Sequence, residues 1–352
     1  MADFSQYGTP SEEWRKVSNL VPAPHPGLSF IERREHSNRT REQLSADEMK
    51  IWEPLVQRKD HTIPTRDQST IEARSYRPAN ADTTGKPPVL LYLHGGGFFS
   101  GTIATEDATC SRLAVHNNAI VLNVCYRHTP EHTYPTAWDD THDAFEWLHD
   151  HIVDLGGDYQ RVLVGGISSG AYLAASFVLE KHLGRRCVSR PAIAGQILMV
   201  PCLLNTSCHG PILKKFKDPA VCSLQQLCNA PTLPMSTFQM ITKMLQIPDP
   251  KEEDLRLNPG YVSASRAEGL PPTVIVTAGM DILRDEGLLY AKTLTEASVP
   301  TDVHVVPGLP HAFAAIPGLS EGKQRWNKIL DGAIVWALSK PTAKENFSIQ
   351  AE

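Results

Sequence analysis

The chain has 352 residues, of which 41% are hydrophobic and 21% are charged, and its formal net charge is -5. A chain of this length can bury a large core, and the mild negative charge leaves no basic field that would attract nucleic acid or anionic lipid. We therefore expect small-molecule chemistry, with no nucleic-acid partner.

The N-terminal 20 residues are polar and include Asp3, Glu12, Glu13, Arg15 and Lys16, so they contain no apolar run typical of a signal peptide or a membrane span. This predicts a cytoplasmic protein without membrane insertion. The seven cysteines are odd in number and contain no Cys-x-x-Cys pair, which argues against a disulfide framework or a zinc knuckle. Four of them lie close together in the sequence, where we interpret them as buried or solvent-lining thiols: Cys202, Cys208, Cys222 and Cys228.

Short β-branched or aliphatic runs alternate with helical patterns along most of the chain. A helical segment is expected near 42–55, followed by an antiparallel strand pair at 61–64 and 70–76. Alternating strands and helices are then expected at 89–93, 106–116, 119–124, 137–151, 161–164, 169–182, 195–200, 273–277, 285–297 and 302–306. Repeated strand-helix units of this kind predict an α/β protein with a doubly wound, mostly parallel sheet.

Two stretches interrupt this alternation. Residues 1–55 are polar and rich in proline, and residues 202–265 separate two core strands. Because a structureless loop of such length is unusual inside a compact domain, the second stretch should be a cap with helices of its own, one of them at 235–247. We therefore divide the chain into an N-terminal cap segment (1–55), a first core part (56–201), a cap insertion (202–265) and a second core part (266–352).

A Gly-x-Ser-x-Gly match follows the expected strand at 161–164 and precedes a helix. At such a turn the serine, Ser168, occupies a sharp, strained corner with its hydroxyl exposed, while Gly166 and Gly170 leave room for neighbouring backbone. The following helix directs its N-terminal amides at the same place. The match alone could be an ordinary loop, but its position between a strand and a helix predicts that Ser168 is a nucleophile.

A serine nucleophile needs a base, and the base needs an orienting acid. Catalytic groups in a doubly wound sheet come from the carboxyl ends of strands, where Asp281 and His311 follow two consecutive expected strands. Asp285 and Glu286 are rival acids, although their place in a helix N-terminus has a dipole explanation. We predict Asp281 as the acid and His311 as the base.

The expected strand at 89–93 ends in His-Gly-Gly-Gly-Phe-Phe at 94–99. Successive glycines leave backbone N–H groups free to face a ligand, and a developing oxyanion requires such donors. We predict an oxyanion hole made of the amides of Gly96, Gly97 and Ser169, with His94 bracing the loop. Phe98 and Phe99 beside this loop are predicted to bind substrate, and the cap, rich in Met and Cys, suggests an apolar acyl group or ring.

Together these motifs resemble the hormone-sensitive-lipase-like family of carboxylesterases, the group marked by His-Gly-Gly-Gly. The resemblance extends from about residue 61 to a C-terminal helix at 321–338, and it includes Tyr-Arg-x-x-Pro-Glu at 126–131, an acid loop at 281–287 and a histidine loop at 311–313. It implies the α/β-hydrolase fold with a helical cap, and the triad order Ser168, Asp281, His311. The family usually has an acidic residue just before the nucleophile, where this chain has Ile167.

The expected function is hydrolysis of a small to medium apolar carboxylic ester through an acyl-enzyme on Ser168, without a metal ion or an organic cofactor. A second enzyme reading is acyl transfer, lactonisation or condensation, as in relatives from secondary metabolism, where another nucleophile replaces water. A third reading is a non-catalytic ligand receptor on this scaffold. Such receptors lose a triad member, whereas all three are present here. The sequence is compatible with a homodimer.

Overall fold

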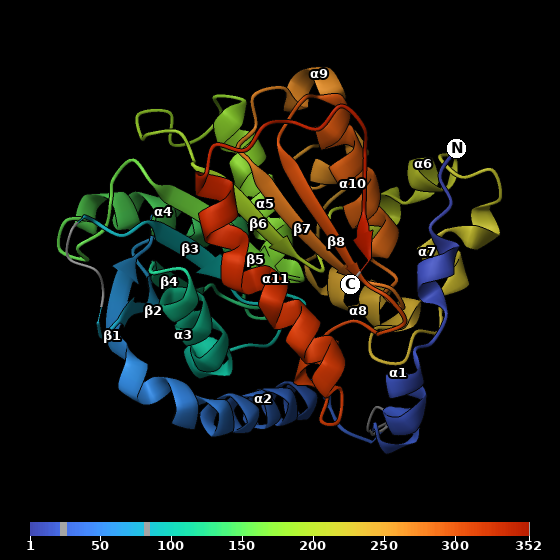
Figure 1. Cartoon of the computed structure of the whole chain (residues 1–352), viewed down its shortest axis with the longest axis horizontal. Coiled ribbons are helices and arrows are strands. Elements are labelled where there is room, and N and C mark those ends of the chain that lie inside the picture. The colour runs from blue at the N-terminus through green and yellow to red at the C-terminus, as the bar shows by residue number, and fades with distance from the viewer. Residues whose placement is uncertain (22–26, 81–84, 352) are drawn as a thin grey trace.

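The computed structural model describes residues 1–21, 27–80 and 85–351. In this part of the chain, nine strands form one sheet in the order β1-β2-β4-β3-β5-β6-β7-β8-β9 (Figure 1). β1 and β2 pair antiparallel, as do β2 and β4, and the remaining neighbours are parallel. The predicted mostly parallel sheet with an antiparallel pair at one edge is therefore confirmed. The strands are β1 Val56–Pro64, β2 Thr70–Pro78, β3 Val89–Leu93, β4 Ile120–Cys125, β5 Val162–Ile167, β6 Gly195–Met199, β7 Thr273–Ala278, β8 Thr301–Val306 and β9 Gln350–Ala351.

Helices cover both faces of this sheet, which explains why its central strands are apolar throughout rather than alternating. On β3, Leu91 and Leu93 belong to the core cluster that includes α4, α5 and α10, whereas Leu90 and Tyr92 belong to the cluster that includes α3 and α11. The helices are α1 Glu12–Val17, α2 Phe30–Trp52, α3 Asp107–His116, α4 Thr136–His151, α5 Ser169–His182, α6 Gly210–Leu213, α7 Ser223–Gln226, α8 Met235–Met244, α9 Ala264–Ala267, α10 Arg284–Glu296 and α11 Ser320–Leu338.

The N-terminal helix is longer than the sequence suggested. The expected helix near 42–55 begins at Phe30 and ends at Trp52, and a capping box between Ser29 and Glu32 starts it. The prediction missed the first turns because this helix is almost entirely polar, with only Ser45 and Met49 buried. α2 runs along α3 and past one end of α11 (Figure 1). The predicted cap segment 1–55 also contains residues 22–26, which lie outside the described residues.

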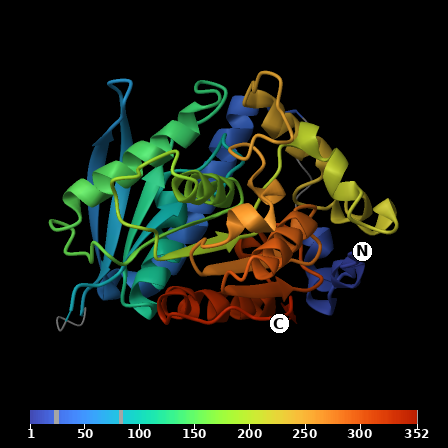
Figure 2. The ribbon, with the colours of Figure 1, turned by 90° about the horizontal axis from the view of Figure 1, so that it is seen from above.

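The stretch 202–265 contains the short helices α6, α7 and α8, and its end includes the start of α9. α8 covers Met235–Met244, close to the expected 235–247, and it buries Phe238, Ile241 and Thr242. Figure 2 shows this part of the chain gathered at one side of the sheet. The division of the chain into core and cap stays a prediction. Among the described residues, we find no helix long and apolar enough to cross a membrane.

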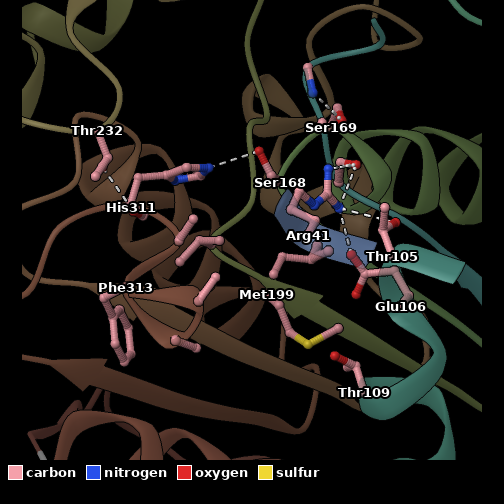
Figure 3. A pocket seen from close by; sticks show the side chains of 18 of the residues that line it. Arg41, Thr105, Glu106, Thr109, Ser168, Ser169, Met199, Thr232, His311 and Phe313 are labelled. Carbon is pink, nitrogen blue, oxygen red and sulfur yellow. Dashed lines mark hydrogen bonds and ion pairs between the residues drawn. The ribbon is translucent and has the colours of Figure 1, made fainter. Parts of the chain in front are cut away.

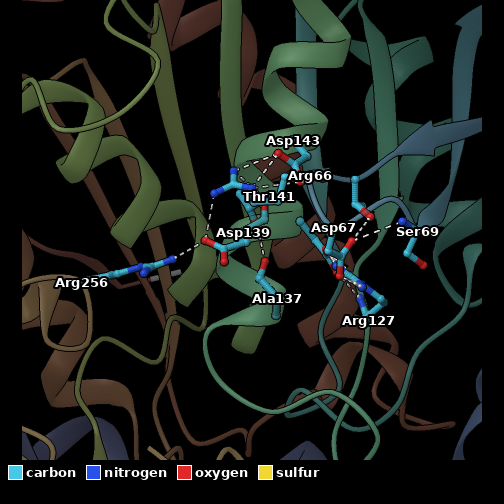
Figure 4. Close-up of polar contacts among 11 residues, drawn as sticks. Arg66, Asp67, Ser69, Arg127, Ala137, Asp139, Thr141, Asp143 and Arg256 are labelled. Carbon is cyan, nitrogen blue, oxygen red and sulfur yellow. Dashed lines mark hydrogen bonds and ion pairs between the residues drawn. The ribbon is translucent and has the colours of Figure 1, made fainter.

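An ion-pair network joins the segment after β4 to helix α4 and to the β1–β2 turn (Figure 4). Arg127 donates from its backbone N–H, Nε and Nη2 to the carboxylate of Asp140, whose side chain is completely buried. Its Nη1 donates to Asp67 in the turn, and Arg66 in the same turn pairs with Asp143 on α4. Because Arg127 belongs to the loop that also carries Tyr126, the network fixes the chain beside the nucleophile turn.

We predict that Arg127→Ala lowers the free energy of unfolding by about 3–5 kcal/mol, because it leaves the buried Asp140 carboxylate without its charged partner. Arg66→Ala is the matched control. Its side chain is 39% exposed, and its loss should cost about 1 kcal/mol or less because solvent screens the pair. Urea unfolding followed by circular dichroism measures both changes. Equal losses of unfolding free energy in the two variants would contradict the larger contribution that we assign to Arg127.

Candidate active site

Ser168 lies at the turn between β5 and α5, with φ 56° and ψ -117°, a strained left-handed corner. Its N–H donates to the carbonyl oxygen of Met199 at 2.8 Å. The flanking glycines are required by space: a Cβ on Gly166 would lie 2.4 Å from the carbonyl oxygen of Leu93, and one on Gly170 would lie 2.0 Å from the same oxygen. The turn is therefore pressed against the end of β3, as the sequence pattern predicts.

His311 and Asp281 follow β8 and β7, and their side chains meet beside the turn. His311 Nε2 lies 3.0 Å from Ser168 Oγ (Figure 3), and His311 Nδ1 lies 2.6 Å from Asp281 Oδ2. Asp281 is buried, and its other oxygen accepts from the N–H of Leu283 at 3.0 Å. Thr232 donates to the carbonyl oxygen of His311 at 2.8 Å, so the stretch 202–265 also holds the histidine loop.

The rival acids have other partners. Asp285 accepts from Arg284 at 2.7 Å and from the N–H of Ser223 at 2.7 Å. Glu286 accepts from the backbone N–H groups of Leu203 and Leu204 at 2.7 and 3.0 Å. Both carboxylates are buried and attach the stretch 202–265 to α10. Neither has a hydrogen bond to His311 among the described residues, which leaves Asp281 as the acid in contact with the imidazole.

The loop after β3 requires glycine at two of the predicted oxyanion positions. Gly96 has φ 134° and Gly97 has φ 63°, and a Cβ on Gly96 would lie 1.9 Å from the carbonyl oxygen of Ser100. The Gly97 N–H donates to Ser169 Oγ at 3.0 Å, a contact that the sequence analysis did not foresee. Ser169 Oγ in turn lies 3.2 Å from the hydroxyl of Tyr126.

Tyr126 and His94 support this loop from behind. Burial raises the pKa of Tyr126, so its hydroxyl stays protonated and donates to the carbonyl oxygen of His94 at 2.8 Å. His94 is fully buried and stacks on the Tyr126 ring. Its Nδ1 lies 2.9 Å from the carbonyl oxygen of Gly95, which can only accept, so this nitrogen carries the proton. Burial lowers the pKa of His94 well below its ordinary value, which keeps the ring neutral. These contacts agree with the predicted bracing role.

A pocket of about 410 Å³ opens over Ser168 and His311. Its walls come from α2, the loop after β3, α3, the stretch 202–265, the histidine loop and α11. Apolar side chains form much of it: Leu44, Leu113, Ile167, Met199, Val200, Leu233, Phe238, Ile241, Phe313, Trp326 and Leu330. Polar residues of α2, α3 and α11 line it as well: Ser37, Arg41, Ser45, Glu48, Thr109, Arg112, Lys323 and Asn327. These helix residues lie far apart in the sequence and meet only in the folded chain, so no local pattern identifies them.

The predicted substrate contacts differ in their surroundings. Phe98 and Phe99 both line the pocket, but the Phe98 side chain is 2% exposed and stacks on Trp138 with ring centroids 5.2 Å apart. Phe99 is the more accessible of the two, and its ring packs against Phe30 of α2. All seven cysteines are free thiols, and of the four in or beside the cap, Cys202 lines the pocket. The methionine that lines it, Met199, comes from β6.

Comparison with known proteins supports the same architecture. A model of the α/β-hydrolase fold matches residues 90–315. Esterase LipI of Mycobacterium tuberculosis is 34% identical over 252 residues, which cover 71% of this chain and 72% of that protein. A bacterial heroin esterase superposes with a TM-score of 0.76 at 28% identity, over 94% of this chain and 99% of that one.

Vibralactone cyclase superposes with a TM-score of 0.82 over 95% of this chain and 96% of that one, but at 24% identity this likeness concerns the fold. The residues matched by the family model include the glycine loop, the serine turn, Asp281 and His311. The chain belongs to the α/β-hydrolase family and, within it, to the hormone-sensitive-lipase-like esterases that its motifs resemble.

Proposed function

We propose that this protein is a serine carboxylesterase that cleaves a carboxylic ester through an acyl-enzyme on Ser168. The observation that carries the proposal is the unbroken contact from Ser168 Oγ through His311 to Asp281, with distances of 3.0 and 2.6 Å. Relatives named esterase or carboxylesterase support an ester as substrate. Water is the acyl acceptor in this proposal.

The proton path follows from the hydrogen bonds. His311 Nδ1 carries a proton toward the Asp281 carboxylate, which leaves Nε2 free to accept the proton of Ser168 as Oγ attacks the ester carbonyl. The imidazolium then gives this proton to the leaving alcohol. A water molecule then attacks the acyl carbon while His311 Nε2 takes one of its protons, and the imidazolium returns this proton to Ser168 Oγ as the bond to the acid breaks. Asp281 holds the ring and stabilises its charge throughout these steps.

The tetrahedral intermediate needs donors beside Ser168, and the amides of Gly96, Gly97 and Ser169 are the proposed ones. The Gly97 N–H points at Ser169 Oγ, so it must turn from this hydroxyl to the oxyanion, or share its hydrogen between the two. The Tyr126 proton goes to the carbonyl oxygen of His94, so at 3.2 Å the Tyr126 oxygen accepts from the Ser169 hydroxyl.

A pocket of about 410 Å³ fits a small to medium ester, and its apolar lining favours an apolar acyl or alcohol group. The ester class beyond this, a role in secondary metabolism, a cytoplasmic location and a homodimer stay predictions from the sequence. Polar residues of α2, α3 and α11 also line the pocket. We therefore propose that one end of the substrate carries oxygen atoms or contacts water.

We predict that Ser168→Ala lowers kcat/KM for p-nitrophenyl butyrate by about 10⁴-fold or more, because the acyl-enzyme cannot form. Asp281→Asn should lower kcat by about 10⁴-fold, because the amide favours the wrong imidazole tautomer. Ser263→Ala, at an exposed position, is the control and should leave turnover unchanged. Normal turnover in folded Ser168→Ala would refute the assignment, and mass spectrometry of the acylated protein would locate the true nucleophile.

Arg41 on α2 reaches the oxyanion loop from the cap side. Its Nη1 and Nη2 each lie 3.3 Å from the carbonyl oxygen of Gly95, and Nη2 pairs with buried Glu106 at 2.6 Å (Figure 3). Glu106 also accepts from the hydroxyl of Tyr92. The Gly95 carbonyl and the Gly96 N–H belong to one planar peptide, so fixing the oxygen aims the N–H in the opposite direction. A cation on the oxygen also polarises this N–H.

We predict that Arg41→Ala lowers kcat by about 10–100-fold with a much smaller change in KM, since an oxyanion-hole donor is worth about 10²–10³ in kcat when removed outright. The kcat of Arg41→Lys should lie between those of the unchanged protein and of Arg41→Ala, because lysine keeps the positive charge but lacks the paired N–H donors of the guanidinium. Arg39→Ala, on the exposed face of the same helix, is the control. Steady-state kinetics with p-nitrophenyl acetate measures the changes in kcat and KM separately. A rise in KM with unchanged kcat would instead mean that Arg41 only shapes the pocket.

A further inference from the structure

Three side chains that could ligate a metal ion converge behind the oxyanion loop, and none of them has a hydrogen bond to Ser168 or His311 among the described residues. They are His94 after β3, Cys125 at the end of β4, and His128 in the following loop, and one ligand atom from each lies within 4.8 Å of the others. The rings of His94 and His128 stand edge to face with centroids 5.2 Å apart. His94 braces the oxyanion loop through its Nδ1, but no step of the acyl transfer uses His94 Nε2, Cys125 or His128.

The two imidazoles have unused nitrogens. His94 Nε2 and His128 Nε2 are both buried, and neither has a hydrogen-bond partner within the described ranges. Buried polar atoms are almost always paired, because leaving one unpaired costs free energy, so two unpaired nitrogens in one cluster call for a ligand. His94 donates its other ring N–H to the carbonyl oxygen of Gly95. A metal-bound histidine typically uses its second nitrogen in this way.

We propose that His94, Cys125 and His128 bind a divalent metal ion of borderline softness, with Zn²⁺ as the type. Two neutral imidazoles and a thiolate are ligands that such ions prefer, whereas Ca²⁺ and Mg²⁺ require oxygen. As the S–Zn bond forms, the thiol proton of Cys125 passes to solvent. Bonds of about 2.0–2.3 Å require the three ligand atoms to move closer than they stand, by about 1 Å at the widest pair.

The cluster also has a route to solvent and a source for the remaining ligand. A second cavity of about 320 Å³ is lined by Cys125 and His128, and Glu72, Glu131 and His132 line it as well. Glu131 is already paired with Arg34, so a water molecule completes the coordination from the cavity side, at the open position that three-ligand zinc sites keep. The ion can enter by the same route without opening the substrate pocket.

Zinc binding by the Ser168→Ala variant tests the proposal. This variant retains all three ligands and lacks the serine that could bind zinc together with His311, so its result does not depend on whether Ser168 is the nucleophile. After chelator dialysis, titration with ZnSO₄ against a chromophoric chelator should show one tight site per chain. Added Cys125→Ser and His128→Leu changes should each weaken this affinity at least tenfold.

Cys228→Ser is the matched control, because Cys228 is a partly exposed thiol in the cap insertion outside the cluster, and it should not alter the affinity. Circular dichroism checks that each variant is folded. Co²⁺ provides a second measurement that needs no ligand variant: one equivalent should give a thiolate-to-cobalt charge-transfer band and four-coordinate d–d bands, and the Cys228→Ser protein should give the same spectrum. Absence of a tight site, an equal affinity in Cys125→Ser, or a cobalt spectrum without thiolate character would each overturn the proposal.

Discussion

The close approach of α5 to the end of β3 is the constraint on which the site depends. Gly166 and Gly170 bring the nucleophile turn to within contact of the Leu93 carbonyl, where any side chain would collide. This approach forces Ser168 into its left-handed corner and sets Ser169 beside Gly97. The strain is tolerated because the buried parallel strands on both sides over-determine the turn. The oxyanion loop and the nucleophile are thus positioned by one packing contact.

The two segments outside the core strands do more than cover the pocket. α2 contributes Arg41 behind the oxyanion loop, and the stretch 202–265 contributes Thr232 on the carbonyl of His311. The second stretch is itself attached to α10 through buried Asp285 and Glu286. The acids that rivalled Asp281 in the sequence therefore serve the same site indirectly, because they hold the segment that holds the histidine loop.

The sequence was most informative where a local pattern and a strand end coincide. Ser168, Asp281 and His311 each follow a core strand, and the ends of parallel strands meet at one edge of the sheet, so their meeting could be predicted. The start of α2 could not, because its polar sequence carries little periodicity and is begun by a capping box alone. The same holds for Arg41 and for the convergence of His94, Cys125 and His128, since these contacts join segments with no common spacing.

Phe98 shows a different limit of sequence reasoning. Its place beside the glycine loop predicts a substrate contact, and it does line the pocket, but its ring is almost fully buried and stacks on Trp138. Phe99, one residue on, remains at the pocket and meets Phe30 of α2. Both residues line the pocket, so proximity in sequence identifies the loop but not how much of each side chain is exposed there.

Just before the nucleophile, where the family usually has an acidic residue, this chain has the uncharged Ile167. Here the isoleucine lines the pocket and its side chain approaches Gly95, so this part of the wall is apolar. The charge lies instead in the Arg41–Glu106 pair, which meets the same peptide from the other side through the Gly95 carbonyl. The guanidinium belongs to α2, so in this chain the electrostatics of the oxyanion loop depend on this helix as well as on the loop's own residues. Substrates that alter the seating of α2 should therefore affect turnover as well as binding.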